Sequence, residues 1–185
     1  MQVALAGRTA QIVGPDGPIG RAIAAALCAN GADLVTAPEP ANILVVDARA
    51  GVAADAVVQR ARDGASVMSE AGWGRIVLIV DVAGVVPVRN EMNASLTATA
   101  LMQATRVLAM EFGGYGVLVN AVAAGPLQDE PRAARTASHV PLGRAPRPED
   151  VANAVLFLID PDNSYTTGHV LSVDGGWSAG FTRDF

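Results

Sequence analysis

The sequence predicts an α/β fold in which a parallel sheet carries helices on both faces. One observation favours this class, and a second indicates a single domain. Short runs rich in β-branched residues alternate along the chain with longer stretches rich in Ala and Leu. The chain also has the size of a single domain: its 185 residues, 51% apolar and 17% charged, suit one compact core, and no linker, repeat or low-complexity tract divides it. We therefore expect one domain over residues 1–185.

The expected strands are the short β-branched runs. They cover residues 10–13, 33–36, 43–46, 75–80, 117–123 and 169–173. Only six residues, two of them proline, separate the second run from the third. A crossover between adjacent parallel strands needs a dozen or more residues. The second and third strands are therefore not expected to be neighbours.

The expected helices are the Ala- and Leu-rich stretches between these runs. They cover residues 19–30, which end at Gly31, then 53–69, 92–112 and a stretch that begins near Pro148. At this last helix, a proline in the first turn and the acidic residues that follow it suit a helix N-terminus.

The charge balance argues against a nucleic-acid partner. Acidic residues number 18 and basic residues 13, which gives a formal net charge of −5. No broad cationic surface is therefore expected to neutralise phosphates. All 13 basic residues are arginine, so the chain can perform no lysine chemistry.

Cysteine and histidine usage excludes several kinds of site. The single cysteine, Cys28, excludes an internal disulfide, and its Ala- and Leu-rich surroundings predict a buried side chain in a reducing compartment. His139 and His169 stand apart from each other and from carboxylate clusters, so no metal site is expected. No apolar run approaches the roughly 20 residues of a membrane helix, and the N-terminus lacks a signal-peptide pattern, so we expect a cytoplasmic protein without a membrane partner.

A Gly-rich turn and four later motifs point to one enzyme family. The turn, Val-Gly-Pro-Asp-Gly-Pro-Ile-Gly at residues 13–20, lies where a pyrophosphate can meet a helix N-terminus. It is followed by Gly-Trp-Gly-Arg-Ile-Val at 72–77, Val-Asn-Ala-Val-Ala-Ala-Gly-Pro at 119–126, Arg-Pro-Glu-Asp-Val-Ala at 147–152 and Val-Asp-Gly-Gly-Trp at 173–177. Together these motifs resemble the short-chain dehydrogenase/reductase family over nearly the whole chain. The resemblance implies a Rossmann-like doubly wound parallel sheet in an oxidoreductase that binds a nicotinamide cofactor.

The resemblance also implies that the catalytic groups are missing. Members of the family use a Ser, a Tyr and a Lys, and the matching positions here are Asp81, Ala94 and Ala98. Alanine supplies neither the phenol nor the ammonium that moves a proton to or from the alcohol oxygen. An ionised Asp81 would repel the negative charge that develops on a carbonyl oxygen. We therefore expect no catalytic residue in this chain.

The cofactor turn departs from the family pattern in a similar way. The family expects glycines at 14, 18 and 20; Gly14 and Gly20 are present, Gly17 is an additional glycine, and Pro18 replaces the middle one. Pro18 lacks an N–H and places a ring where the backbone should approach phosphate, although proline also begins a helix well. Glu39 stands where an acid could bind a ribose, or is a solvated loop charge. We expect this chain to bind no cofactor, and NAD or NADP to bind in a partner subunit.

Three internal segments are shorter than the family pattern. The resemblance implies loss of the third strand and its helix between residues 36 and 42, of part of the fourth helix within 51–74, and of the substrate lid within 127–140. These segments bind adenine, relay protons and cover the substrate in the family.

The long helix at residues 92–112 is apolar on more of its circumference than one core-facing stripe requires. In the family this helix packs against another subunit, and the last helix, last strand and C-terminal tail form a second contact. The residues expected at such interfaces are Met92, Leu96, Leu101, Val107, Met110, Phe157, Val170, Trp177 and Phe181. The alternatives are a helix buried in its own core and a tail that covers its own sheet.

Loss at the site with retention at interfaces predicts a non-catalytic pseudoenzyme subunit. It would assemble with a full-length, active NAD(P)-dependent short-chain dehydrogenase as a heterotetramer, and a hydroxyacyl-CoA dehydrogenase is one option for that partner. Three alternatives remain. They are a stand-alone homo-oligomeric ligand-binding or regulatory protein, an active reductase with an unusual proton donor, and a remnant of gene decay.

Overall fold

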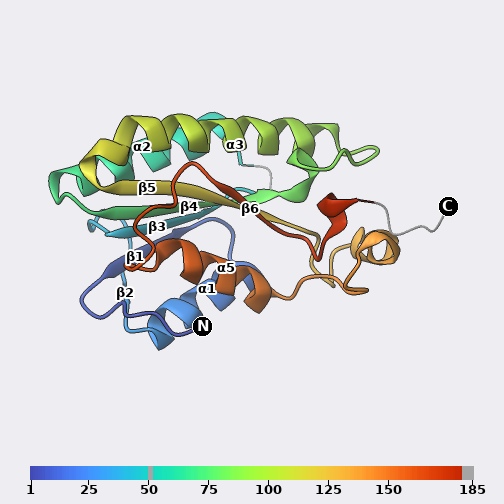
Figure 1. Cartoon of the computed structure of the whole chain (residues 1–185), viewed down its shortest axis with the longest axis horizontal. Helices are drawn as coiled ribbons and strands as arrows, with labels where there is room; N and C mark the ends of the chain where they lie inside the picture. The colour runs from blue at the N-terminus through green and yellow to red at the C-terminus, as the bar shows by residue number, and fades with distance from the viewer. Residues whose placement is uncertain (50–51, 181–185) are drawn as a thin grey trace.

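The computed structural model describes residues 1–49 and 52–180, and within them six parallel strands form one sheet in the order β2-β1-β3-β4-β5-β6 (Figure 1). The strands are β1 (Thr9–Val13), β2 (Asp33–Leu34), β3 (Ile43–Asp47), β4 (Gly74–Asp81), β5 (Val117–Ala124) and β6 (Val170–Val173). β1 lies between β2 and β3, which confirms that the second and third strands are not neighbours. The second strand is two residues shorter than expected, and the last begins one residue later.

Helices cover both faces of the sheet, as Figure 1 shows, with α2 and α3 on one face and α1 and α5 on the other. Their bounds are α1 (Pro18–Ala29), α2 (Ala54–Glu70), α3 (Met92–Phe112), α4 (Ala133–Thr136) and α5 (Pro148–Ile159). Four 3₁₀ turns lie in the described residues: η1 (Val82–Gly84), η2 (Gly113–Tyr115), η3 (Ala137–His139) and η4 (Trp177–Ala179). This arrangement confirms the predicted α/β, doubly wound fold.

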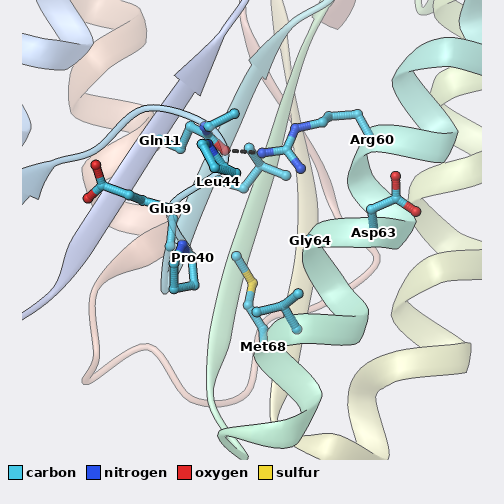
Figure 2. Close-up of a pocket in the computed structure, with 12 residues that line it drawn as sticks. Gln11, Glu39, Pro40, Leu44, Arg60, Asp63, Gly64 and Met68 are labelled. Atoms are coloured by element: carbon cyan, nitrogen blue, oxygen red, sulfur yellow. Dashed lines mark hydrogen bonds between the residues drawn. The ribbon is translucent and has the colours of Figure 1, made fainter.

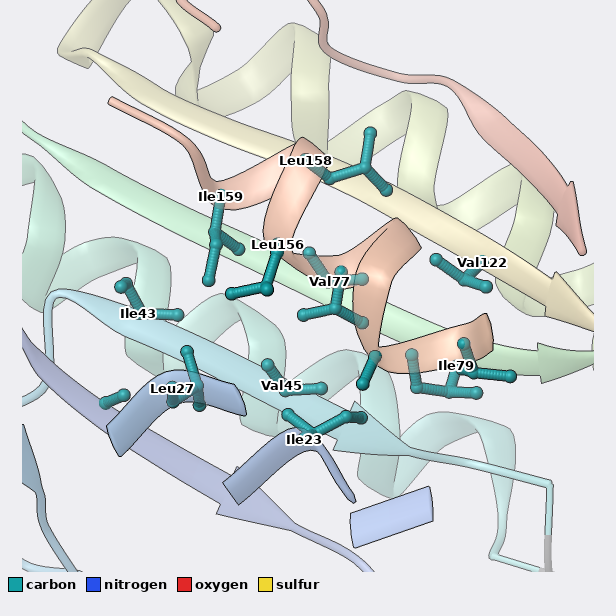
Figure 3. Packing of buried hydrophobic residues seen from close by; sticks show 14 of the residues in the cluster. Ile23, Leu27, Ile43, Val45, Val77, Ile79, Val122, Leu156, Leu158 and Ile159 are labelled. Atoms are coloured by element: carbon teal, nitrogen blue, oxygen red, sulfur yellow. The ribbon is translucent and has the colours of Figure 1, made fainter. Parts of the chain in front are cut away.

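The three central strands are buried along their whole length. Every residue of β3, β4 and β5 is buried because helices cover both faces. On one face, Ile23 and Leu27 of α1 pack with Leu156 of α5 against Val45 and Val77 of the sheet (Figure 3). Complete burial of each such side chain contributes about 1.5–3 kcal/mol to folding.

Strand β1 differs because it is only partly buried and carries a polar side chain, Gln11, on one face. Side chains alternate along a strand; Ala10 and Ile12 pack in the core beside α1, whereas Gln11 points to the α2 side. On that side Arg60 of α2 donates to the amide oxygen of Gln11, which is buried, and Val13 packs against the cluster that includes residues of α2. Residues 35–42, which join β2 to β3, contain neither a strand nor a helix.

Cys28 corrects one expectation from the sequence. The helix α1 buries Ile19, Ile23 and Leu27, which lie four residues apart on one stripe. Cys28 follows Leu27 and is turned away from that stripe, so its thiol is exposed rather than buried. Among the described residues, no helix combines the length and apolar content needed to cross a bilayer.

Candidate functional site

The three positions that the resemblance matches to the catalytic Ser, Tyr and Lys come together at the carboxyl edge of the sheet, where ligands bind in open α/β folds. Asp81 ends β4, and Ala94 and Ala98 lie on α3. All three line one cavity of about 150 Å³, together with Arg49 from the segment after β3. The structure brings the three matched positions together in one cavity, and the small alanine side chains leave its interior open.

Both oxygens of the Asp81 carboxylate have partners. One accepts a hydrogen bond from the N–H of Ala83 at 2.8 Å, which caps the η1 turn. The other accepts from the Arg132 guanidinium, which lies in the segment after β5 just before α4. Asp81 is thus bound on both sides and does not present a free carboxylate to the cavity.

Arg132 belongs to a chain of buried and half-buried ion pairs, here called the edge network: Asp47, Arg49, Asp81, Glu91, Glu130 and Arg132. Arg132 lies 3.6 Å from the Glu130 carboxylate and 4.0 Å from that of Glu91. The Arg49 guanidinium lies 3.1 Å from the Glu130 carboxylate and 3.4 Å from the Asp47 carboxylate, so it links the two. Four carboxylates and two guanidiniums give this network a formal charge of −2.

The edge network also fixes the protonation of Arg132. Burial acts to lower the pKa of its guanidinium, but the hydrogen bond and charge of Asp81, with the charges of Glu130 and Glu91, raise that pKa above its ordinary value. Arg132 therefore stays charged and cannot act as a proton donor.

The two tyrosines lie away from this edge. Tyr115 is in η2, which precedes β5, and Tyr165 is in the segment before β6, so both lie at the amino ends of their strands. Asp81 lies at the carboxyl end of β4. Neither phenol therefore lines the cavity at Asp81.

The Gly-rich turn shows which of its glycines the packing requires. Gly14 follows β1 with a positive φ of +145°, and a Cβ on it would lie 2.9 Å from the backbone oxygen of Asp47. This glycine allows the close contact between the turn and the end of β3. By contrast, a Cβ on Gly17 or Gly20 would lie 3.8 or 3.7 Å from the Pro15 oxygen, which is ordinary contact.

The turn fits a pyrophosphate poorly. Pro18 occupies the first turn of α1 and therefore provides no N–H at the place where phosphate oxygens need donors. Asp16 lies in the turn itself and pairs with Arg21 at 2.9 Å, and Asp47 lies directly against Gly14. Both carboxylates would repel phosphate. Glu39 is exposed in the segment between β2 and β3 and lines a different cavity.

The expected interface residues separate into several groups. Met92, Leu96, Val107 and Met110 are 70%, 62%, 41% and 86% exposed on the outer side of α3, and with exposed Ala100 they form what we call the α3 stripe. The prediction that Leu101 lies at an interface was wrong, because this side chain is fully buried against the chain's own sheet. Phe157 is exposed on α5, Val170 and Trp177 are half-buried, and Phe181 lies outside the described residues.

A comparison with protein-family models identifies the family of this chain. A family model described as "Enoyl-(Acyl carrier protein) reductase" matches residues 44–178. The chain belongs to the short-chain dehydrogenase/reductase family. This family member is 41% identical over 111 residues to the 3-oxoacyl-[acyl-carrier-protein] reductase of Aquifex aeolicus, which covers 56% of this chain and 45% of that protein.

Other relatives agree with this assignment. The cis-4-hydroxycyclohexanecarboxylate dehydrogenase of Sinomonas cyclohexanicum is 37% identical over 120 residues, 60% of this chain and 48% of that enzyme. The chain thus spans about half the length of the curated relatives that it matches. A short-chain dehydrogenase/reductase structure from Burkholderia thailandensis has a TM-score of 0.79 and 23% identity, and the match covers 94% of each chain, which supports the shared fold.

The edge network is the feature that the sequence interpretation missed. Arg49, Glu91, Glu130 and Arg132 lie in connecting segments, where no periodic pattern fixes a position. One signal was present: Asp47 and Asp81 each end a strand, and β3 and β4 are neighbours, so their last residues must meet at one edge.

Proposed function

We propose that this chain is a non-catalytic subunit that assembles in the cytoplasm with a full-length, active short-chain dehydrogenase. The observation that carries the proposal is the Asp81–Arg132 ion pair beside Ala94 and Ala98. Carbonyl reduction needs a group that donates a proton and stabilises a developing oxyanion. At the three matched positions this cavity offers two alanines and a carboxylate that is already bound to a guanidinium, and its other polar lining side chains are Arg49, Asn93 and Thr97.

The charge of the edge network supports the same conclusion. A formal charge of −2 at the catalytic edge opposes the build-up of negative charge on a substrate oxygen. It also opposes the approach of a phosphate-bearing cofactor, as do Pro18 and Asp16 in the Gly-rich turn. In this proposal the partner subunit holds the NAD or NADP, which supplies or accepts the hydride there.

The α3 stripe supports assembly with another subunit. Its large side chains are exposed in the single chain, and a row of exposed large apolar side chains is typical of an interaction surface. Burial of these side chains, at up to about 1.5–3 kcal/mol each, would offset part of the cost of association. We extend the proposal to a heterotetramer, with a hydroxyacyl-CoA dehydrogenase as the partner class. Support for that class comes from a matched relative named as a 3-oxoacyl-[acyl-carrier-protein] reductase.

Native mass spectrometry tests this proposal. The tagged chain is expressed alone and together with a full-length short-chain dehydrogenase from the same genome, and NAD or NADP is added to the purified species. We expect a complex that contains both chains, with nucleotide bound once per full-length subunit. A stable homo-oligomer that ignores the other protein and binds nucleotide itself would overturn the proposal in favour of a stand-alone binding protein.

Two variants locate the contact. A Leu96→Asp, Met110→Asp double variant places charges on the α3 stripe and is expected to lose the partner. Cys28→Asp adds a charge at an exposed position on α1, on the other face of the sheet, and is expected to retain it. Equal effects of both changes would contradict the assignment of the interface to α3.

A further inference from the structure

A second cavity, of about 160 Å³, lies between α2 and the segment that joins β2 to β3. Figure 2 shows Gln11 and Leu44 of the sheet at its floor, Pro40 on one side and Met68 of α2 on the other. We call this cavity the α2 groove. It is distinct from the cavity at Asp81, and none of its lining residues belongs to the edge network.

The α2 groove lies above Gln11 of β1, between α2 and residues 37–41 of the β2–β3 segment. The β2–β3 segment lies beside the opening and is anchored by Asn42, whose side-chain oxygen accepts from the N–H of Thr9 at 3.1 Å. On the opposite side, Gly64 allows α2 to lie close to the sheet, since a Cβ there would lie 2.8 Å from the side chain of Leu44. The floor is closed by Arg60, whose guanidinium donates to Gln11.

The walls of the α2 groove are mainly apolar and reach the surface. Pro38, Pro40 and Ala41 come from one side, and Met68 and Val67 from the other. Val67 is 48% exposed, although it is a large apolar residue. At about 160 Å³ the cavity is smaller than the roughly 300–1,000 Å³ of small-molecule sites, so it suits one large apolar side chain better than a whole metabolite or cofactor.

The rim of the α2 groove is acidic. Glu39 and Asp63 are exposed at opposite sides of the cavity (Figure 2), and Asp55 and Glu70 lie exposed along the same helix as Asp63. The two arginines of α2 do not offset this charge toward solvent. Arg60 points inward to Gln11, and Arg62 pairs with Glu111 of α3 at 2.8 Å.

We propose that the α2 groove is a docking site for a basic amphipathic segment of another protein. One apolar side chain of that segment fills the cavity beside Met68 and Val67, and flanking Lys or Arg side chains lie over Glu39 and Asp63. Charge complementarity selects this partner over a second copy of the chain, because the chain itself has a net charge of −5 and an acidic rim. The inference does not depend on the proposed pseudoenzyme role.

A binding assay with a defined probe tests this inference. The probe is a fluorescein-labelled 14-residue helical peptide composed only of Leu and Lys in an amphipathic pattern, and a Leu/Glu peptide of the same pattern is the charge control. Fluorescence anisotropy with the full chain measures each affinity. We expect binding of the Leu/Lys peptide alone, and about tenfold weaker binding to a Glu39→Lys, Asp63→Lys variant, because two ion pairs become repulsive contacts.

Matched variants distinguish the groove from the α3 stripe. Val67→Asn should weaken binding of the Leu/Lys peptide, because it removes an apolar contact without adding charge, whereas Leu96→Asp on α3 should leave it unchanged. All these side chains are exposed, and circular dichroism verifies that each variant is folded. Failure of the Leu/Lys peptide to bind, or loss of its binding in Leu96→Asp but not in the charge-reversed variant, would overturn the inference. Neither result bears on whether the chain assembles with a dehydrogenase.

Discussion

Arg132 and Asp81 form an ion pair that joins the segment after β5 to the last residue of β4. Both side chains are largely buried, with 15% and 7% of their surface exposed. The pair lies where the family's catalytic serine would be. The network to which it belongs extends from the end of β3 to the start of α3 and to the segment before α4. The ion pairs of this network therefore link the end of β3, the end of β4 and the segment after β5.

The first prediction concerns how much the Asp81–Arg132 ion pair contributes to the free energy of unfolding. Arg132→Met should lower the free energy of unfolding by about 3 kcal/mol, because it leaves the buried Asp81 carboxylate without its counter-charge. Urea unfolding followed by circular dichroism measures the loss. The paired variant Asp81→Leu, Arg132→Met should lose clearly less, since replacement of both members of a buried ion pair by apolar residues is often close to neutral.

The Arg21–Asp16 pair provides the control for this prediction. It is an ion pair of 2.9 Å whose side chains are 63% and 90% exposed. Arg21→Met should cost less than about 1 kcal/mol, because exposed ion pairs contribute little. A loss from Arg132→Met as small as that from Arg21→Met would contradict a structural role for the edge network.

A second prediction concerns the glycines of the Gly-rich turn. Gly14→Ala should destabilise the fold by about 2 kcal/mol or more, because its φ is +145° and its Cβ would collide with Asp47. Gly20→Ala should be neutral or should stabilise the fold by up to about 1 kcal/mol, since Gly20 lies in α1 and a Cβ there makes only ordinary contacts. Thermal denaturation of both variants checks the contrast, and equal melting temperatures would refute it.

Much of the fold follows from the sequence because strong periodic patterns determine it. The bounds expected for the long helix at residues 92–112 are those of α3, and the six residues before β3 were too few for a crossover. The structure also brings Asp81, Ala94 and Ala98 into one cavity, and their match to the family's catalytic positions stays a prediction. These features depend on spacing along the chain, which the sequence states directly.

Other features depend on the orientation of a side chain, which the sequence leaves open. The helix α3 is apolar on two sides, so its pattern does not tell which side meets the sheet; Leu101 is buried and Leu96 is exposed. The same ambiguity explains Cys28, which follows a buried Leu27 among alanines that suit either side. The partner of Asp81 comes from a connecting segment 51 residues away, beyond the reach of any local pattern.

A third prediction concerns pH and the start of α5. The Asp150 carboxylate accepts hydrogen bonds from Arg144 at 2.6 Å and from the N–H of Arg147 at 2.8 Å. The hydrogen bond from Arg144 is the largest of the effects that hold the pKa of Asp150 well below its ordinary value. Burial opposes it, and the hydrogen bonds from Arg147 lower the pKa further. Because the folded state lowers this pKa, the ionised carboxylate stabilises the fold above the unfolded pKa of about 3.9, and the contribution is lost as the pH falls toward the lowered value.

Asp150→Asn should therefore destabilise the protein by about 1 kcal/mol at pH 7, the usual contribution of a helix cap. The difference from the unsubstituted chain should shrink below about pH 4, where the unfolded carboxyl becomes protonated. Urea unfolding of both proteins at pH 7 and at pH 3 measures this difference. Glu149→Gln, at the neighbouring residue, is the matched control and should show a smaller change. A deficit in Asp150→Asn that does not depend on pH would exclude the ionised carboxylate as its cause.

The fourth prediction separates the two sides of α3. Leu101→Ala should lower the free energy of unfolding by about 2–5 kcal/mol, because it leaves a cavity in the core against β4 and β5. Leu96→Asp changes a side chain that is 62% exposed and should alter the stability of the isolated chain by no more than about 0.5 kcal/mol. For assembly with the partner, Leu96→Asp should have the larger effect. It should weaken the complex, whereas the Leu101→Ala molecules that remain folded should still bind. Unfolding curves measure the stability of the two variants, and native mass spectra of the same preparations measure their assembly with the partner. A Leu96→Asp chain that unfolds as readily as Leu101→Ala would show that the outer side of α3 stabilises the chain's own fold and is not reserved for a partner.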